Sequence, residues 1–407
     1  MTTKNRLRSL TIAGALVAAL ALGACSSSDK SGSTSSNTDS TSSGGSAPAP
    51  GPGSGGEVTV GTIFNLTGTG ALIGKSLQVG LQLGLADAEK DTGVKVKLVE
   101  ADAGDSNTVA LSALKSVMRA NPAVIFGPYL GTQILAMRPE LHKAGVPMMV
   151  ESGTKSIVEG ADADMVYRWY LSTAISEPAT AKYTVDKLGV KKAAIFYDTT
   201  SYGQDGLALV ESQLKSQGVD IVAKESLDPK AKDYSGQVHA ALADNPDAVY
   251  VQLIGGAAGG VLLKNLSAAG NKAHIVWGSG IVSQSLLGLV TDNEVDGAFG
   301  NSVAIVNSST SDPKVQDFLK RFKEKAGFDG DQFALAAYDA GQFIGRGAAS
   351  GLTTPKQWSD QLNSAKYAGL LANYANDGSH NMITQTSIVQ FKGKIPSVVA
   401  VDKGKNG

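Results

Sequence analysis

One stretch indicates the fold most directly: residues 123–150, AVIFGPYLGTQILAMRPELHKAGVPMMV. It begins with a short apolar run, 123–126, and ends with another, 147–150, and each has the length of a buried strand. Residues 132–144 between them mix apolar and polar side chains as an amphipathic helix does. A strand, a helix and a second strand in this order predict two parallel strands with the helix against the sheet.

The same alternation extends in both directions along the chain. Upstream we expect strands at 57–64 and 94–101, each followed by a helix, at 76–90 and near 107–120. Downstream we expect a second series, with strands at 191–197, 219–225, 248–254 and 273–278 and helices near 204–217, 234–243 and 258–269. Such alternation predicts the α/β class, with parallel strands and helices on both faces of each sheet.

The second series resembles a copy of the first. In both, an apolar strand leads through a loop, ending in Ile73-Gly74 or Tyr202-Gly203, into a helix that ends at a Gly-Val pair. Residues 57–407 also exceed what one hydrophobic core usually serves. We therefore expect two similar lobes, with a binding cleft where the carboxyl ends of their strands face each other.

The amino terminus has the pattern of an export signal, which we assign to residues 1–24. Lys4, Arg6 and Arg8 precede an apolar run from Leu10 to Ala24, too short to span a bilayer as a mature helix. The run ends in Leu-Gly-Ala-Cys, which resembles the lipobox of bacterial lipoproteins and predicts lipidation of Cys25. Cys25 is the only cysteine, so no internal disulfide can form.

Residues 25–56 are expected to be a disordered tether behind the lipidated cysteine. They are almost wholly Ser, Gly, Thr, Pro, Ala and Asn, so they bury too little apolar surface to offset the entropy of ordering. A flexible coil of this length reaches on the order of 30 Å. The predicted location is therefore outside the cytoplasm, with the protein anchored to the membrane by lipid.

The charge of the chain argues against nucleic acid as a partner, and its hydropathy argues against a membrane-spanning segment after residue 24. The chain has 36 basic and 37 acidic side chains, a net charge of −1 and no basic cluster, so nucleic acid is not an expected partner. No stretch after residue 24 is long and apolar enough to span a membrane.

No signature of catalysis is complete. In GTGALIGKS, residues 68–76, Thr69 occupies the place of the first glycine of a phosphate loop, and Ile73 that of the third glycine of a dinucleotide fingerprint. There is no G-x-S-x-G motif, and the four histidines lack the spacing of metal ligands. We therefore expect no enzymatic activity, no catalytic residues, no metal and no cofactor.

Small polar residues follow two successive predicted strands. Gly131 and Thr132 open a helix whose first N–H groups, those of Gly131, Thr132 and Gln133, would face outward and attract an anion. Ser152, Gly153 and Thr154 end the next strand and present hydroxyl and N–H groups toward the same edge. Thr132 and Thr154 could instead cap helices, but two such loops side by side favour a ligand site.

The lipobox and four further segments occur in a fixed order: VIFGPYLGTQ (124–133), GVPMMVESGT (145–154), AAIFYDTTSYGQDG (193–206) and AAYDA (336–340). Together they resemble the leucine/isoleucine/valine-binding type of solute-binding protein of ABC importers. The resemblance covers essentially all of residues 57–407. It implies a type I periplasmic-binding fold: two Rossmann-like lobes with parallel sheets, joined by a hinge of three crossovers near residues 172, 301 and 382.

Both lobes would then be discontinuous in sequence. Lobe 1 would comprise residues 57–172 and 302–381, and lobe 2 would comprise residues 173–301 and 382–407.

The resemblance also implies ligand-binding positions in the first lobe. The carboxylate-binding loop of the family falls on Leu130 and Gly131, where only backbone groups are available. The next ligand loop falls on Ser152, Gly153 and Thr154.

Five more residues complete the expected site. The aromatic position of the first loop is Ile73 here, and the second-lobe aromatic is Tyr202. A further second-lobe position is the apolar Ile254. Tyr129 would contact an apolar ligand body, and Ser279 would tune selectivity.

Ser279 is the main departure from the family, because amino-acid binders tend to have a carboxylate there. A buried ammonium group without an anionic partner would cost several kcal/mol. Either Asp198, Glu151 or Asp339 neutralises it, or the solute carries no ammonium group. In the second case the side chains that suit an apolar or aromatic body with a carboxylate or amide head are Trp277, Tyr202, Tyr129 and Ile73.

Two of the named side chains have an equally good structural interpretation. Trp277 follows an apolar strand and could lie in the core as well as in the cleft. Asp339 belongs to a predicted helix, where capping or hydrogen bonding between lobes competes with ligand contact.

The function implied is that of a lipid-anchored, extracytoplasmic receptor. It would capture a small solute, a branched-chain amino acid or a similar small carboxylate or amide, between hinged lobes and deliver it to ABC permease transmembrane subunits. We expect it to act as a monomer. The alternative is a ligand-sensing lipoprotein that docks on a signalling receptor, since the fold serves both roles.

Overall fold

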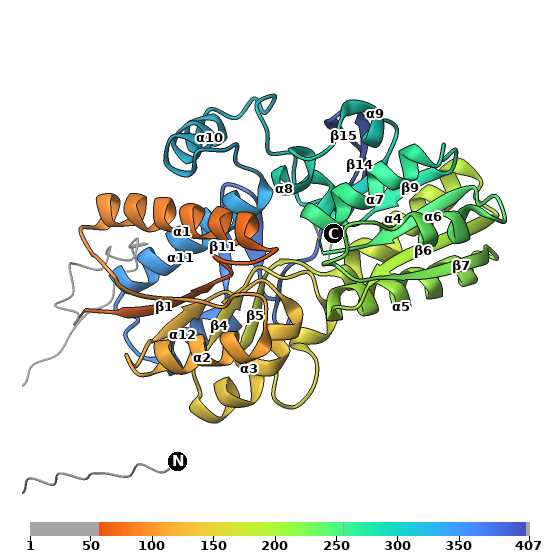
Figure 1. Ribbon diagram of the computed structural model, residues 1–407. Helices are drawn as coiled ribbons and strands as arrows, with labels where there is room; N and C mark the ends of the chain where they lie inside the picture. Colours follow the sequence, from red (N-terminus) through yellow and green to blue (C-terminus); the bar gives the residue numbers. More distant parts are fainter. Residues whose placement is uncertain (1–56, 255, 404–407) are drawn as a thin grey trace, which may run out of the picture. The chain divides into compact units, whose positions relative to one another are not determined.

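A computed structural model describes residues 57–254 and 256–403 (Figure 1). The predicted signal peptide at 1–24, the lipidation site Cys25 and the tether at 25–56 lie outside the described residues and stay predictions.

A six-stranded sheet forms the centre of the first half. Its strands are, in order across the sheet, β13 (Asn381–Ile383), β5 (Val166–Leu171), β4 (Met148–Val150), β3 (Val124–Phe126), β1 (Thr59–Phe64) and β2 (Lys97–Asp102). Every neighbouring pair is parallel. The buried strand residues are mainly Val, Ile, Met and Phe, which suit a sheet covered on both faces.

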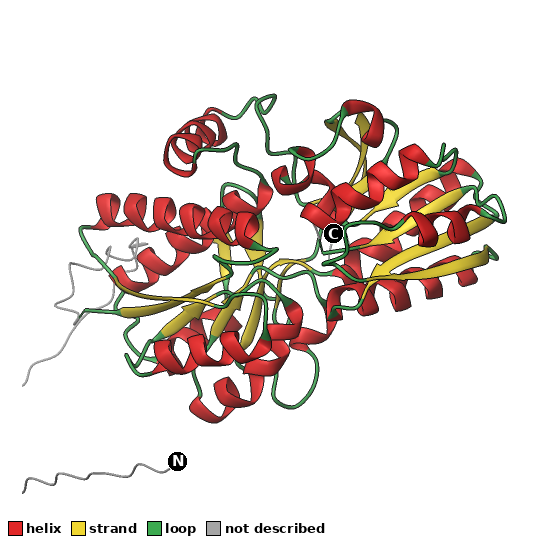
Figure 2. Cartoon of the chain, in the orientation of Figure 1, coloured by secondary structure: helices red, strands yellow, loops and turns green. Residues whose placement is uncertain are grey.

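Helices cover both faces of this sheet, as Figure 2 shows. On one face lie α1 (Ala71–Thr92) and α11 (Gln332–Ala349), and on the other α2 (Asn107–Met118) and α3 (Gly131–Ala144). The half is completed by α10 (Pro313–Ala326), α12 (Pro355–Asn363), the 3₁₀ helix η1 (Lys155–Val158) and a two-stranded sheet of β11 (Lys366–Ala368) and β12 (Asn373–Ala375).

Helices α1 and α11 lie side by side in Figure 1 and approach closely because glycines face the contact. A Cβ atom added to Gly84 would lie 2.1 Å from the carbonyl oxygen of Tyr338, so only glycine fits there.

A seven-stranded sheet forms the centre of the second half. Its strands are, in order, β15 (Ile395–Asp402), β14 (Thr386–Lys392), β10 (Phe299–Ser302), β9 (His274–Trp277), β8 (Ala248–Gln252), β6 (Lys192–Asp198) and β7 (Asp220–Leu227). The strands from β10 to β7 are parallel, whereas β14 pairs antiparallel with both β10 and β15.

Helices again cover both faces. One face carries α4 (Thr173–Leu188) and α5 (Ser201–Ser216), and the other carries α6 (Ser235–Leu242) and α7 (Gly256–Ala268). Three short helices follow β9: η2 (Ser279–Val282), α8 (Gln284–Leu287) and α9 (Asp292–Val295).

The expected duplication is confirmed by the strand order. The first half reads β2-β1-β3-β4-β5 and the second reads β7-β6-β8-β9-β10, which is the same order of equivalent strands. The α/β class and the parallel sheets are likewise as predicted. The chain passes from one sheet to the other three times: between Leu171 and Thr173, after Ser302, and between Ile383 and Thr386.

One predicted boundary was wrong. The first helix was expected at 76–90 after a loop ending at Ile73, but α1 begins at Ala71 and includes Ile73 in its first turn. Gly74 allows this early start, because a Cβ atom there would lie 1.9 Å from the carbonyl oxygen of Asn65.

Candidate functional site

A cavity lies where the carboxyl ends of strands from both sheets meet. It holds about 490 Å³ of space free of protein atoms, including its opening to solvent. Its described lining residues are Ile73, Tyr129, Glu151, Ser152, Gly153, Tyr170, Tyr202, Leu253, Ile254, Ser279, Gly280, Ser283 and Phe333. In the first half they follow β1, β3 and β4 or belong to β5 and α11, and in the second half they follow β6, β8 and β9, so both halves build one site.

Seven of the ten predicted ligand-binding residues come together here: Ile73, Tyr129, Ser152, Gly153, Tyr202, Ile254 and Ser279. Leu130 lines a smaller neighbouring cavity together with Ile73, Tyr129 and Ile254. Gly131 and Thr154 line neither.

Thr154 lies behind the cavity wall and contacts Gly131 closely. A Cβ atom on Gly131 would lie 2.1 Å from the Thr154 Oγ1 atom, and Thr154 is fully buried. Its hydroxyl accepts a long hydrogen bond of 3.4 Å from the Ser152 hydroxyl and does not cap η1. Thr154 thus joins the loops after β3 and β4 in this conformation.

The helix end at α3 differs from expectation in one detail. The N–H group of Gln133 was expected to point outward, but it donates to the carbonyl oxygen of Leu130 at 3.0 Å. No side chain caps α3, so the capping interpretation of Thr132 is wrong.

The loop after β4 is held from behind by a buried arginine. Arg168, on β5, is 0% exposed and donates to the carbonyl oxygens of Ser152 at 2.6 Å and Lys155 at 3.0 Å. Its Nε donates to Asn381 Oδ1 on β13 at 2.8 Å. Burial lowers the pKa of the Arg168 guanidinium to about 9. These bonds fix the position of Ser152 and Gly153 on the cavity wall.

Tyr202 reaches the cavity from the first turn of α5. Thr200 caps this helix by accepting from the N–H group of Gly203 at 3.3 Å. The ring lies against the opposite half, because a Cβ atom on Gly153 would lie 3.2 Å from Tyr202 Cε2. The contact between Gly153 and Tyr202 therefore bridges the two halves across the cavity.

Asp198 supports the second-half wall and is not part of the lining. Its carboxylate accepts from the Thr200 N–H at 2.9 Å, from the Thr200 hydroxyl and from the Ile254 N–H at 2.8 Å. Asp198 thereby holds together the loops that carry Tyr202 and Ile254.

Asp339 likewise does not line the cavity, and its carboxylate accepts hydrogen bonds from another part of the chain. It accepts from the N–H groups of Leu370 at 2.7 Å and Leu371 at 2.8 Å and from the Tyr374 hydroxyl at 3.0 Å. Burial raises the pKa of Asp339 to about 6. These bonds support a structural role for Asp339, as an anchor for the 370–371 loop.

Trp277 is a core residue. It is 0% exposed and belongs to the apolar cluster with Leu263, Leu286 and Val251. Ser279 and Gly280, which follow it, line the cavity instead.

Three cavity tyrosines are held in their neutral form by burial. Burial raises the pKa values of Tyr129, Tyr170 and Tyr202 well above the ordinary value. The tyrosines therefore offer apolar ring surface and neutral hydroxyl groups.

Five lining residues were not predicted: Tyr170, Leu253, Gly280, Ser283 and Phe333. Tyr170 lies at the end of β5 and Phe333 follows the Asp331 cap of α11, and neither sequence context resembles a binding motif. Glu151 was considered only as a possible partner of an ammonium group. Leu253, Gly280 and Ser283 lie next to the predicted positions Ile254 and Ser279, whereas Tyr170 and Phe333 are brought to the cavity by the fold from segments without a local signal.

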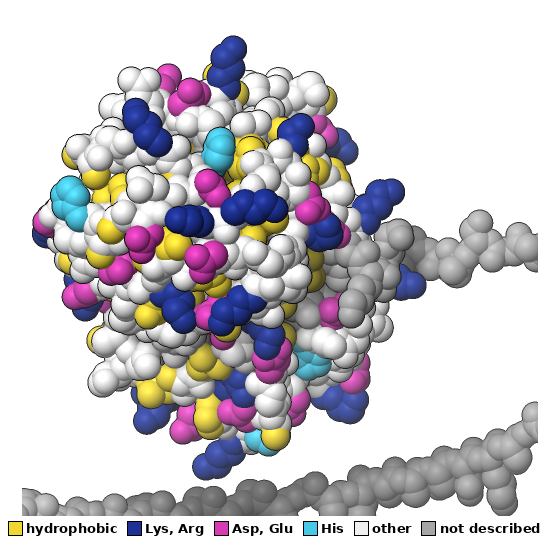
Figure 3. Space-filling model, turned by 90° about the vertical axis from the view of Figure 1, so that its right-hand side faces the viewer, with side chains coloured by type: hydrophobic (Ala, Val, Ile, Leu, Met, Phe, Trp, Pro, Cys, Tyr) yellow, Lys and Arg dark blue, Asp and Glu magenta, His cyan; other side chains and the backbone are white. Residues whose placement is uncertain are grey.

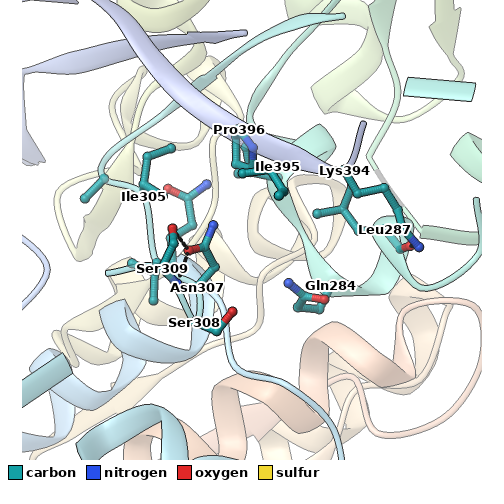
Figure 4. Close-up of a pocket in the computed structure, with 13 residues that line it drawn as sticks. Gln284, Leu287, Ile305, Asn307, Ser308, Ser309, Lys394, Ile395 and Pro396 are labelled. Carbon is teal, nitrogen blue, oxygen red and sulfur yellow. Dashed lines mark hydrogen bonds between the residues drawn. The ribbon is translucent and has the colours of Figure 1, made fainter. Parts of the chain in front are cut away.

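A second cavity lies near the β14–β15 turn and is shown in Figure 4. Two of its polar side chains bond within the chain: Lys394 Nζ donates to the carbonyl oxygens of Leu287 and Val290 at 3.2 Å, and Asn307 Oδ1 accepts from Ser309. It lacks the contribution of strand ends from both sheets, so we place the candidate site in the first cavity.

Other kinds of site are not seen in the described part of the chain. Residues 57–254 and 256–403 hold no group of three His, Cys, Asp or Glu side chains placed to bind a metal. Among the same residues, no helix combines the length and the apolar character needed to cross a bilayer. Figure 3 shows Lys and Arg interspersed with Asp and Glu on the face it presents.

Comparison with known proteins identifies the class. Residues 57–395 match the family model described as periplasmic binding protein. The chain therefore belongs to the periplasmic binding protein family.

Among known proteins, the chain is similar in sequence to several that are named Leu/Ile/Val-binding proteins. The chain is 24% identical over 296 residues to Leu/Ile/Val-binding protein homolog 3 of Brucella melitensis, covering 72% of this chain and 78% of that protein. It is 23% identical over 353 residues to the Leu/Ile/Val-binding protein BraC3 of Rhizobium johnstonii, covering 85% and 94%.

Solved structures share the fold. The leucine binding protein LivK of Thermotoga maritima aligns with a TM-score of 0.74 at 20% identity, covering 86% of this chain and 99% of that one. A solute binding protein of Rhodopseudomonas palustris in complex with 3,4-dihydroxybenzoic acid aligns with a TM-score of 0.75 at 17% identity, covering 86% and 98%. The type I periplasmic-binding fold predicted from the sequence is thereby confirmed.

Proposed function

We propose that this protein is an extracytoplasmic receptor that captures a small solute in the cavity between its two halves and delivers it to an ABC permease. The observation that carries the proposal is the lining itself. Seven residues expected to contact ligand, drawn from both sheets, surround one cavity with aromatic and aliphatic side chains and a few polar groups.

The two halves act as hinged lobes. Lobe 1 comprises residues 57–172 and 302–381, lobe 2 comprises residues 173–301 and 382–407, and the hinge lies at the three crossovers. Contacts between the sheets' loops support this: the Ser156 N–H donates to Asp205 at 2.9 Å, and the Gln284 N–H donates to Asp331 at 3.0 Å. A solute that contacts both walls favours the closed form over the open one.

The solute is held by its polar head and its apolar body at different walls. Ser152 and Gly153 offer small side chains and N–H groups to the head, while Thr154 and Gly131 support this wall from behind and Leu130 lies beside the cavity. Ile73, Tyr129, Tyr202 and Ile254 cover the body, and Ser279 tunes selectivity. Relatives named for leucine, isoleucine and valine support an amino acid or a similar small carboxylate or amide.

Attachment to the membrane completes the proposal. Cys25 carries the lipid, and residues 25–56 tether a monomeric receptor near the permease. Buried lipid chains contribute about 0.8 kcal/mol per CH₂ group, so two or more chains anchor a protein stably.

Thermal-shift and calorimetric screening tests the capture of a solute. A branched-chain amino acid, an aromatic carboxylate or a short amide should raise the melting temperature, since a ligand at a hundred times its Kd adds about 2.7 kcal/mol of stability. Tyr202→Ala should weaken the binding of the same ligand, because the substitution removes the side chain that bridges both walls of the cavity. Failure of every such compound to bind would contradict the proposal.

A further inference from the structure

We infer that the solute carries a positively charged nitrogen, such as the ammonium group of an amino acid, and that Glu151 is its counter-ion. The inference rests on the proposed function, because it names the class of solute that the same cavity takes.

Glu151 stands directly after β4, between the strand and Ser152, and lines the cavity. Its side chain is nearly inaccessible, with the residue 3% exposed. Neither carboxyl oxygen has a hydrogen-bond partner among the residues that the structure describes. A buried polar group without partners destabilises a protein, so native structures retain such groups where something else satisfies them.

The other deeply buried acids behave differently and serve as an internal comparison. Glu177 accepts from Gln252 at 2.9 Å and Asn301 at 3.1 Å. Asp331 accepts from the N–H groups of Gln284, Phe333 and Ala334, and Asp198 and Asp339 are likewise fully engaged. Only Glu151 combines burial, a place in the cavity wall and two free oxygens within the described chain.

The charges around Glu151 decide the sign of its partner. None of the described lining residues is Lys, Arg or His. The groups that face Glu151 are Asp331, the N-cap of α11, and Asp339 within α11, with Tyr170 of β5 and Tyr374 of β12 as the titratable neutral groups. The acidic groups disfavour an anion next to Glu151, whereas a cation there would be attracted by them and by the ionised Glu151.

Binding of a cation is therefore coupled to a proton. Burial, and then Asp331 and Asp339, raise the pKa of Glu151 well above its ordinary value, so the carboxyl group of the empty cavity keeps its proton to a higher pH. When an ammonium group enters, the carboxyl group ionises, the carboxylate pairs with the ammonium group, and the proton leaves to solvent. Affinity should rise with pH, by up to about tenfold per pH unit, until the free cavity is itself ionised.

The test compares four probes that share or lack the amine: L-leucine, 3-methylbutylamine, 4-methylpentanoate and 3,4-dihydroxybenzoate. Calorimetric titrations at pH 6, 7 and 8, in two buffers with different ionisation enthalpies, give the affinity and the number of protons released. The proteins are the unmodified chain, Glu151→Gln and the matched control Glu140→Gln, whose acid is exposed on α3.

The amine-bearing probes should bind the unmodified chain with release of up to one proton. Glu151→Gln should lower the affinity for these probes by on the order of a hundredfold and abolish the proton release. Glu140→Gln should change neither. Tighter binding of 4-methylpentanoate or 3,4-dihydroxybenzoate than of L-leucine, or equal binding to Glu151→Gln, would overturn the assignment of Glu151 while leaving the receptor function intact. If none of the four probes bound even the unmodified chain, both proposals would be overturned together.

Discussion

At the scale of single residues, the buried acidic side chains in and around the cavity fall into two kinds. Most of them accept hydrogen bonds that hold the structure together, and one of them does not. Asp198 and Asp339 each accept hydrogen bonds that hold loops in place, and Glu177 lies in a network with Gln252 and Asn301. Glu151 makes no such bond within the described residues and is adjacent to the ligand loop. This difference explains how a site with Ser279 in the place of a carboxylate can still accept an ammonium group.

The raised pKa of Glu151 has a consequence for stability. A carboxyl group whose pKa is higher in the folded than in the unfolded chain binds more protons when folded, so its contribution to stability falls as pH rises. Glu151→Gln keeps the size and the neutral character of the protonated acid. Relative to the unmodified protein, the variant should therefore gain stability as pH rises from 5 to 9, because the unfolded chain loses its Glu151 proton at lower pH than the folded chain does.

Urea denaturation of the empty protein across that pH range measures the difference. The control Glu140→Gln, at an exposed position, should have the same free energy of unfolding as the unmodified chain at every pH. A difference between Glu151→Gln and the unmodified chain that stays constant with pH would show that Glu151 does not titrate as described.

At the scale of elements, the ligand loop after β4 depends on a side chain from the next strand. Arg168 donates to two carbonyl oxygens of that loop and to Asn381, so β5, β13 and the loop form one unit. The position of Ser152 and Gly153 in the cavity wall is thus set from behind, by a side chain that does not itself line the cavity.

Arg168→Met should lower the free energy of unfolding by on the order of 3 kcal/mol, because it leaves buried carbonyl oxygens without donors. It should also weaken solute binding, since the loop loses its anchor. Arg346→Met is the matched control: that arginine is half-exposed and pairs with Asp91 at 2.7 Å, so its loss should cost less than about 1 kcal/mol. Equal destabilisation of the two variants in chemical denaturation would contradict the role of Arg168.

The elements themselves were largely predictable in the two repeated series. Strands such as 123–126 and 191–197 are apolar runs, and helix ends are marked by glycine, as at Gly93 with φ of +73°. The start of α1 was missed because residues 68–74 are rich in glycine, which in isolation indicates a loop. β5 and β10 were not predicted, and after residue 313 only the helix that contains Asp339 was predicted. The strands among the missed elements pair with strands that are distant in sequence.

At the scale of the whole molecule, two copies of one topology contribute different chemistry to a shared cavity. The first half supplies Glu151, Ser152 and Gly153, and the second supplies Tyr202 and the backbone around Ser279. The sequence could indicate this division, because ligands of open parallel sheets lie beyond the carboxyl ends of the strands. It could not indicate which candidate acid stays free, because that depends on hydrogen bonds made by loops such as 370–371.

Hydrogen–deuterium exchange, measured with and without the tightest-binding of the four probes, tests most directly whether one solute is held by both halves. If it is, backbone amides at residues 152–154 and at residues 200–204 and 279–283 should all exchange more slowly in the complex. Protection confined to one half, or to neither, would contradict capture of the solute between them.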